Sequence, residues 1–424
     1  MKNFMAGTIR RLTALGFILL FLITFAYRAE ALNAGCEMVR VRETGLQTKK
    51  EPLPPLLPLP DNDQSWALGI FMPLSGEYVA IAQRWQQGFA LGISRAAAGR
   101  SFKWHLLLTD SAEISPEIAL KHFKDDHATI ILGPIQSKLA QPTALAALQN
   151  DLPLILLAPQ PELAELGEMI FQHFLSAANQ AREIARFIEQ REEKEEKKVA
   201  LLHPDNDFGL DFAKAFLKAW PEGTSTPTKI STYDPAATDF SLALTALQAP
   251  NPADPEVPEY IFTTLVIADF YPRLRLLAPQ LSFHNLDQCQ LYGTRGGNDS
   301  RLESEAGSSL EGAIFFDLDL NLPKPPPEAD NYRVLYLKTY GEEPSIYDAY
   351  AYDTITILNQ ARAIISCGQA AGLAQALRRL PPLQLATGAT TLSASGEFAK
   401  RLSPIIFRNR VRHNLQSNDG VSGH

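Results

Sequence analysis

The chain has 424 residues, of which 46% are hydrophobic and 20% charged, and its formal net charge is −8. This length allows two packed domains, or one domain of unusual size. The acidic balance argues against nucleic acid or an anionic lipid surface as the partner.

The N-terminus has the organisation of an export signal. Basic residues Lys2, Arg10 and Arg11 precede an apolar stretch from Leu12 to Tyr27, and Ala29-Glu30-Ala31 has the small-x-small form of a cleavage site. The apolar stretch is shorter than the ~20 residues that a spanning helix needs, which favours a cleaved signal peptide over a transmembrane anchor. We therefore expect residues 1–31 to be removed and the protein to act in the periplasm.

A second mode of export remains open. The tripeptide Ala34-Gly35-Cys36 resembles the end of a bacterial lipobox, although Asn33 stands where that motif prefers Leu. A lipid on Cys36 would be the only link to the membrane, and the Pro-rich linker over residues 32–65 would serve as its tether. Export also permits a disulfide between Cys289 and Cys367, but two thiols are equally compatible with the sequence.

Short apolar runs alternate with helical segments from Trp66 onward. Strands are predicted at 67–71, 105–110, 129–134 and 153–159. The spacing of Ile81, Trp85 and Phe89 predicts an amphipathic helix after the first of them. This alternation predicts a parallel sheet covered on both faces, with ligand-facing loops at the carboxyl ends of its strands.

The same pattern restarts after a predicted helix at 179–191. Further strands are expected at KVALLHP, KISTY, PEYIFTT, QCQLYGT and EGAIFF, followed by a helix over 347–365 and a closing hairpin, TTLSASGEFAK and PIIFR. Residues 411–424 are predicted to be disordered. The fold class is α/β, with two lobes of similar construction.

The sequence lacks the common catalytic signatures. It contains no GxxxxGK[ST], GxGxxG, GxSxG, HExxH or CxxC motif. His122 and His127 suit solvated side chains better than a metal pair, and Asp205, Asn206 and Asp207 are expected to cap a helix. We therefore predict a binding protein without cofactor or metal rather than an enzyme.

Several segments together resemble one family. PLSGEYVAIAQRWQQGFALGI, GPIQSKLAQPTALAAL, HPDNDFGLDFAKAF, YDPAATDFSLAL and EPSIYDAYAYDTITIL resemble, in the expected order, the type I periplasmic binding proteins of the leucine/isoleucine/valine-binding class. The resemblance covers Trp66 to Arg410. It implies two Rossmann-like three-layer lobes joined by a three-strand hinge, with residues 66–176 and 318–378 in lobe I and residues 177–317 and 379–410 in lobe II.

This resemblance also implies a function. Lobes of this kind close around a small polar ligand, amino-acid-like or peptide-like, and deliver it to an ABC permease or sense it. The segment 276–316 is similar to the second lobe of penicillin-binding-protein activators, which contact a peptidoglycan synthase. The helical-repeat domain usual in those activators has no counterpart here, which puts that alternative role in doubt.

Candidate ligand contacts in lobe I follow predicted strands. Ser75 and Gly76 come after the first strand, and Ser137 lies at a helix N-terminus that suits a carboxylate. Both serines are equally suited to capping their helices. Gln160 lies in the fourth loop, where Pro159 offers no amide hydrogen, so we expect fewer donors for an α-carboxylate than amino-acid binders of the family supply.

Candidate contacts in lobe II come from the second set of strands. Phe208 matches an aromatic position that closes over the ligand in the family, although a core position suits it as well. Thr263 and Thr264 are predicted to end one strand and Thr294 another. Arg295 and Asp299 in the next loop are suited to reading the charge of a ligand, although simple solvation suits exposed loop charges as well. For Gly209, Asp234 and Asp239 we expect turn geometry and helix capping.

Overall fold

The computed structural model describes residues 65–97, 102–191, 198–220, 229–251, 259–306 and 308–415. The signal peptide predicted for residues 1–31, Cys36 and the linker as far as residue 64 lie outside this part of the chain. No helix in these ranges combines the length and the apolar character that a membrane crossing requires.

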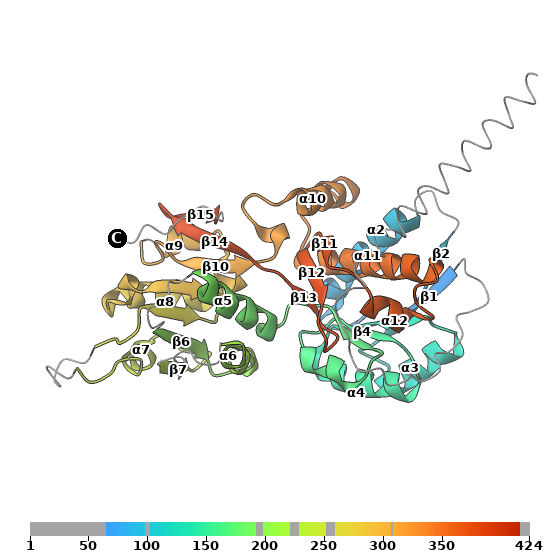
Figure 1. Ribbon diagram of the computed structural model, residues 1–424, viewed down its shortest axis with the longest axis horizontal. Helices are drawn as coiled ribbons and strands as arrows, with labels where there is room; N and C mark the ends of the chain where they lie inside the picture. Colours follow the sequence, from blue (N-terminus) through green and yellow to red (C-terminus); the bar gives the residue numbers. More distant parts are fainter. Residues whose placement is uncertain are drawn as a thin grey trace, which may run out of the picture. The chain divides into compact units, whose positions relative to one another are not determined.

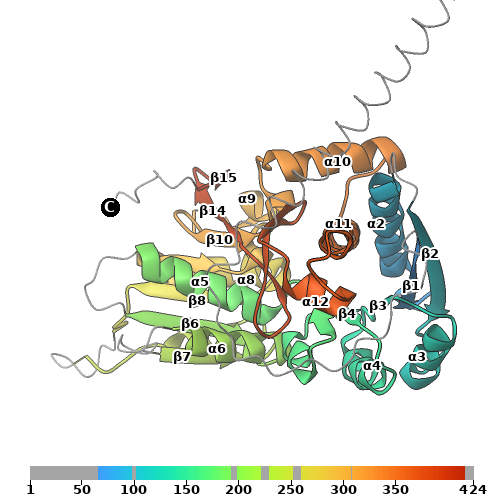
Figure 2. The ribbon, with the colours of Figure 1, turned by 45° about the vertical axis from the view of Figure 1, so that its right-hand side comes forward.

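A five-stranded parallel sheet is built from strands between Ser65 and Gln172 (Figure 1). Its order is β2-β1-β3-β4-β5, with β1 at Ser65–Met72, β2 at Lys103–Asp110, β3 at Ile130–Leu132, β4 at Leu154–Leu156 and β5 at Ile170–Gln172. Successive side chains from Leu68 to Met72 are all buried, so helices and loops cover both faces of β1. Helices α3 (Pro116–Asp125) and α4 (Ser137–Gln149) pack on this sheet side by side (Figure 2).

Helices α2 (Val79–Ala97), α10 (Pro327–Tyr340) and α11 (Ile346–Ser366) share a second core. Leu91, Tyr332 and Ala349 contribute to it from the three helices. Gly88 in α2 lies so close to α11 that an added Cβ would stand 2.1 Å from the carbonyl oxygen of Asp348. Residues 357–381 belong to a separate compact unit, in which α12 (Leu373–Arg378) buries its apolar side chains.

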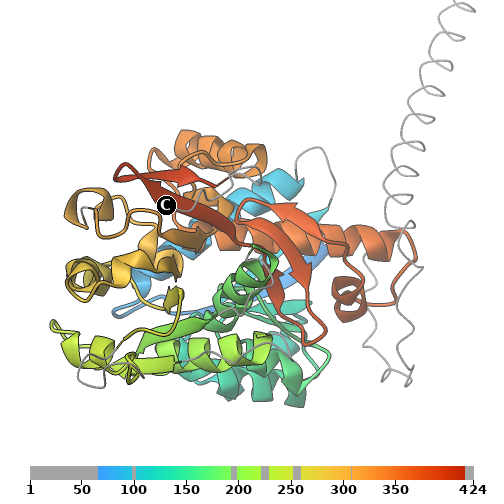
Figure 3. The same cartoon turned by 60° about the vertical axis from the view of Figure 1, so that its left-hand side comes forward.

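The second large sheet has seven strands in the order β15-β14-β10-β9-β8-β6-β7. Strands β6 (Val199–Pro204), β7 (Lys229–Tyr233), β8 (Thr264–Ile267), β9 (Gln290–Gly293) and β10 (Ile314–Asp317) are parallel. Strands β14 (Ser403–Arg408) and β15 (Val411–Asn414) run antiparallel along the β10 edge, where Figures 1 and 3 show them in red.

Apolar helix faces cover the seven-stranded sheet. Leu274, Leu277 and Leu281 of α8 (Tyr271–Phe283) join one core with Leu244 of α7 (Ser241–Thr245) and Leu302 of α9 (Leu302–Glu305). Helices α5 (Ala177–Arg191) and α6 (Asp207–Ala219) pack against each other. From α5, the ring of Phe187 lies 5.0 Å from that of Phe316 in β10.

A small antiparallel sheet, β11-β12-β13, completes the described structure. It consists of Leu383–Leu385, Gly388–Leu392 and Phe398–Lys400. Asp353 of α11 accepts hydrogen bonds from the amides of Ala386 and Thr387 and from the Thr387 hydroxyl, which ties this sheet to the helix. The chain passes from the five-stranded to the seven-stranded sheet after β5, leaves the seven-stranded sheet after β10 for α10, α11, α12 and the small sheet, and returns to it at β14.

The α/β architecture predicted from sequence is confirmed, but several elements differ. The strand predicted at PEYIFTT lies further along the chain. Only the last residue of that segment, Thr264, belongs to β8, which continues to Ile267. PIIFR leaves the hairpin formed by β12 and β13 and pairs with β10 instead. Residues 411–414 form β15, so the disorder predicted from residue 411 is wrong for these four residues.

The structure also tests the two states that the sequence allowed for Cys289 and Cys367. Cys289 keeps its thiol outside any disulfide, and its Sγ lies 3.8 Å from the carbonyl oxygen of Phe262. The disulfide between Cys289 and Cys367 is therefore absent, and the alternative of two free thiols is wrong as well because Cys367 is disulfide-bonded.

Candidate functional site

The carboxyl ends of β1 and β2 carry a connected polar group. Ser75 donates from Oγ to Oδ2 of Asp110 at 2.7 Å, and the amides of Leu74 and Ala112 donate to Oδ1 at 2.9 Å. Partial burial raises the pKa of Asp110, but the hydrogen bonds from Ser75 and the backbone amides outweigh it, so the pKa is lowered. The sequence singled out Ser75 and missed Asp110, whose role as the common acceptor depends on strand adjacency.

Neighbouring loops extend this polar edge. Gly76 is exposed at φ 78°, a left-handed conformation that glycine adopts without strain. Ser111 donates to Oε1 of Gln136 at 2.7 Å, and Gln136 precedes α4 without capping it through its side chain. Ser137 is exposed at the first position of α4. The amide of Leu139 donates to the carbonyl oxygen of Gln136 at 3.1 Å, so an anionic group at this helix end would meet the amides of Ser137 and Lys138.

Gln160 lies in the loop after β4, before the short helix η1 (Pro161–Leu166). Its Oε1 is buried and accepts no hydrogen bond from the described residues. A buried amide oxygen without a donor is unusual in proteins. This loop thus presents an acceptor, whereas Pro159 supplies no amide donor.

The carboxyl edge of the seven-stranded sheet is organised around Asp269. This residue follows β8, is fully buried, and accepts hydrogen bonds from the Tyr233 hydroxyl and from Nε and Nη2 of Arg273. Thr294 follows β9, is also fully buried, and donates to the carbonyl oxygen of Asp269 at 2.7 Å. Thr294 therefore acts on the backbone, where the sequence predicted a ligand contact.

Two aromatic side chains lie at this edge. The half-buried ring of Phe208, at the start of α6, is 4.7 Å from the ring of Phe270, which follows β8. Sequence reasoning missed Asp269 and Phe270 because it placed the strand before them. The apolar run of four residues after Thr264 was the available signal.

Thr264 does not belong to this edge. It begins β8, is buried, and pairs in register with Val199 and Gln290, which begin β6 and β9. Parallel strands start at the same edge of a sheet, so Thr264 lies at the edge opposite to the loops described above. The prediction that Thr263 and Thr264 end a strand is wrong.

The residues assigned to turns and caps have those roles. Asn206 caps α6 by accepting from the amide of Gly209, and an added Cβ at Gly209 would lie 2.0 Å from the carbonyl oxygen of Pro204. Asp234 accepts from the amide of Ala236, and Asp239 from the amide of Ser241.

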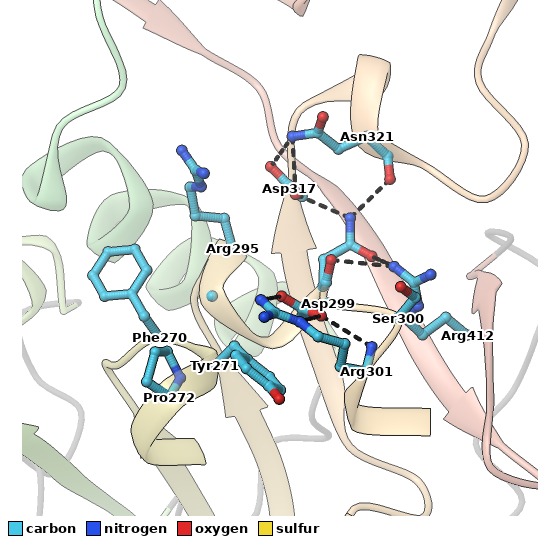
Figure 4. A pocket seen from close by; sticks show the side chains of 12 residues that line it. Phe270, Tyr271, Pro272, Arg295, Asp299, Ser300, Arg301, Asp317, Asn321 and Arg412 are labelled. Carbon is cyan, nitrogen blue, oxygen red and sulfur yellow. Dashed lines mark hydrogen bonds and ion pairs between the residues drawn. The ribbon is translucent and has the colours of Figure 1, made fainter. Parts of the chain in front are cut away.

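A pocket of about 650 Å³ opens beside β8, β9 and β10 (Figure 4). Charged and amide side chains dominate its lining: Arg295, Asn298, Asp299, Arg301, Asp317, Asn321 and Arg412. Arg301 pairs with Asp299 and stacks 3.7 Å above the ring centre of Tyr271. Asp317 accepts from the amides of Asn298 and Asn321.

Asp317 is the buried carboxylate of this pocket. Burial raises the pKa of Asp317. The positive charge of Arg295 and the hydrogen bonds that Asp317 accepts lower this pKa, but burial outweighs them. Within the described ranges, His, Cys, Asp and Glu form no group of three or more that could hold a metal ion.

Comparison with known proteins gives a consistent result. The model of the periplasmic binding protein family matches residues 65–402. The Leu/Ile/Val-binding protein homolog 3 of Brucella melitensis is 24% identical over 339 residues, which span 78% of this chain and 88% of that protein.

Solved structures share the fold at low sequence identity. A protein assigned to a branched-chain amino acid ABC transporter of Rhodospirillum rubrum superposes with a TM-score of 0.71 at 20% identity, covering 83% of this chain and all of the other. LpoA of Haemophilus influenzae superposes with a TM-score of 0.63 at 16% identity, but this match spans 84% of our chain and 59% of LpoA. With the family model matching from β1 to beyond β13, the chain belongs to the periplasmic binding protein family and has its type I fold.

Proposed function

We propose that this protein is an exported receptor that binds a small polar ligand between two lobes and presents it to an ABC-type permease. The observation that carries the proposal is that both large sheets direct polar and aromatic loop residues to the carboxyl ends of their parallel strands. The relatives named for branched-chain amino acids support an amino-acid-like or peptide-like ligand.

The lobes are assigned as residues 66–176 with 318–378 and residues 177–317 with 379–410. Lobe I would hold the ligand through the Ser75–Asp110 pair, the amides at the start of α4 beside Ser137, and Gln160. Phe208 and the pocket residues would complete the site from lobe II. Because a ligand that touches both lobes stabilises the closed arrangement, binding and closure are linked.

Several inferences from the N-terminus belong to this proposal. An export signal over residues 1–31 would carry the chain to the periplasm, where a receptor of this family meets its permease. The protein would act by binding alone, without catalysis and without a cofactor.

Binding is tested by calorimetry with the purified protein over amino acids, their amides, short peptides and muropeptides. We expect micromolar binding by one of these classes, and at least a tenfold loss in Ser75→Ala because the hydroxyl orders the loop after β1 through Asp110. Ser115→Ala is the matched control, since Ser115 precedes α3 and makes no side-chain capping bond. Absence of binding by every class in the wild-type protein would overturn the proposal.

A second candidate function rests on the superposition with LpoA and on the similarity of residues 276–316 to penicillin-binding-protein activators. In that case the protein would regulate peptidoglycan synthesis by contacting a synthase. Crosslinking in intact cells separates the two: capture of a permease supports the receptor, and capture of a synthase without a permease supports the regulator.

A further inference from the structure

The guanidinium of Arg295 differs from every other charged group that lines the pocket. Arg301 pairs with Asp299, and Arg412 pairs with Glu303. Arg295 is half-buried, and in the described part of the chain its side chain makes neither a hydrogen bond nor an ion pair. In Figure 4 it extends away from the Asp299–Arg301 pair, on the side of Asp317.

The backbone holds Arg295 in a fixed position. Its amide donates to Oε1 of Gln180 at 3.1 Å, and the residue begins the short helix η3 (Arg295–Gly297). The two glycines that follow are packed tightly: an added Cβ would lie 2.3 Å from the carbonyl oxygen of Asp269 at Gly296, and 1.8 Å from the ring of Phe315 at Gly297. This close packing leaves the backbone beside Arg295 little room to shift.

Asp317 forms no ion pair with the guanidinium of Arg295. Asn298, Asn321 and the amide of Leu318 already donate to its two oxygens. Arg295 thus lacks the carboxylate partner that Arg301 and Arg412 each have.

An apolar surface accompanies the cation. Phe270 lines the same pocket as Arg295, and its ring is backed by that of Phe208 at 4.7 Å. A guanidinium donates in a planar fork that fits a carboxylate, and an aromatic surface accepts an apolar group. The arrangement matches a ligand that combines both features.

We propose that Arg295 receives an anionic group of the ligand, and that the ligand is a carboxylate whose apolar body lies against Phe270. This inference rests on the function proposed above. It places recognition of the ligand's charge in the loop after β9, and not only in the loops of the first sheet.

The test uses matched pairs of acids and uncharged amides. Calorimetry with the purified protein compares 4-methylpentanoate with 4-methylpentanamide, and phenylacetate with phenylacetamide. We expect at least one acid to bind about tenfold more tightly than its amide, since a hydrogen bond to a charged group exceeds a neutral one by an amount that corresponds to about tenfold in affinity. Arg295→Gln should reduce acid affinity to that of the amide and leave the amide unchanged.

Two further variants complete the design. Arg275→Gln removes the same charge from an exposed position on α8 outside the pocket, and should retain the preference for the acid. Arg295→Lys keeps the charge without the fork and should bind with intermediate affinity. Unchanged amide binding in Arg295→Gln shows that the variant is folded.

The outcomes distinguish this inference from the proposed function. Equal affinity for acid and amide in the wild-type protein, unchanged acid binding in Arg295→Gln, or binding of neither probe overturns the role of Arg295. The receptor function itself fails only if the wider panel of amino acids, amides and peptides also gives no binding.

Discussion

Asp269 illustrates how one buried carboxylate connects three elements at the edge of the seven-stranded sheet. It joins Tyr233 of β7, Arg273 of α8 and, through its carbonyl oxygen, Thr294 after β9. Burial and the neighbouring carboxylate raise the pKa of Tyr233, so its hydroxyl remains a donor at neutral pH. The loop that carries Phe270 is positioned by this network.

The first prediction concerns this carboxylate. Asp269→Ala should lower the free energy of unfolding by about 3 kcal/mol, because it leaves a buried hydroxyl and a guanidinium without their acceptor. Urea denaturation followed by tryptophan fluorescence measures the change. Asp330→Ala is the comparison, since Asp330 lies on the surface 3.9 Å from Arg333 and should cost much less. Equal losses in the two variants would contradict the network.

The second prediction concerns Lys400, whose side chain is 1% exposed and whose Nζ lies 3.9 Å from Oδ2 of Asp353. Burial lowers its pKa from 10.5 to about 8, against the opposing charges of Asp353 and Asp319. Between these two values the unfolded chain holds a proton that the folded chain does not, so this lysine makes stability rise with pH.

Lys400→Met removes that contribution. The free energy of unfolding of the wild-type protein, relative to that of the variant, should therefore be larger at pH 10 than at pH 7.5. Denaturant unfolding of both proteins at the two pH values gives the difference. A relative stability that stays constant or falls would show that Lys400 titrates normally in the fold.

At the scale of elements, the contact between α2 and α11 depends on the absence of side chains. Gly88 and Gly92 face α11, where added Cβ atoms would lie 2.1 Å from the carbonyl oxygen of Asp348 and 2.8 Å from Cβ of Ile355. Helix propensity alone favours alanine at both positions by about 1 kcal/mol. The close approach of the two helices reverses this preference.

The third prediction follows from this reversal. Gly88→Ala should destabilise the protein by about 1–3 kcal/mol through overpacking, despite the gain in propensity. Ala90→Ser, at an exposed position of the same helix, should change stability by much less. Thermal unfolding of both variants provides the comparison. A higher melting temperature for Gly88→Ala would mean that the helices can separate at little cost.

Some strands could be located from local sequence patterns, whereas others became clear only in the tertiary structure. The sequence located β1 to β4 because each is a short apolar run followed by a helical pattern. It missed β5 and placed the strand before Thr264, since three or four buried residues carry too little periodicity. Pairing of PIIFR with β10 could not be foreseen, because its partner lies about ninety residues away.

At the scale of the whole molecule, the two large sheets each carry polar loop residues at the carboxyl ends of their parallel strands, and the proposed receptor function requires that one ligand contacts both sets of loops. Ligand at 100 times its dissociation constant stabilises a folded protein by about 2.7 kcal/mol. If the ligand contacts both lobes, loops of both lobes should become more protected. If it contacts one lobe, protection should be confined to that lobe.

The fourth prediction is therefore made for hydrogen exchange. Saturating ligand should slow amide exchange in loops of both sheets, at residues 110–112 and 136–139 in the first and at residues 205–209 and 294–298 in the second. Mass spectrometry of peptides from the two regions measures it. Protection confined to one sheet would show that the ligand does not bridge the lobes.

The sequence by itself determined the α/β class, the two successive sets of strands and the family, because these follow from local hydrophobic patterns and from motifs in a fixed order. It also selected Ser75, Ser137 and Phe208, which lie next to recognisable strand ends. Only the tertiary structure showed that Asp110 and Asp269 organise the loops, that Thr264 lies at the opposite edge, and that among the described residues Arg295 is the pocket arginine without an ion pair. Hydrogen bonding and burial depend on neighbours distant in sequence, and a linear pattern does not specify them.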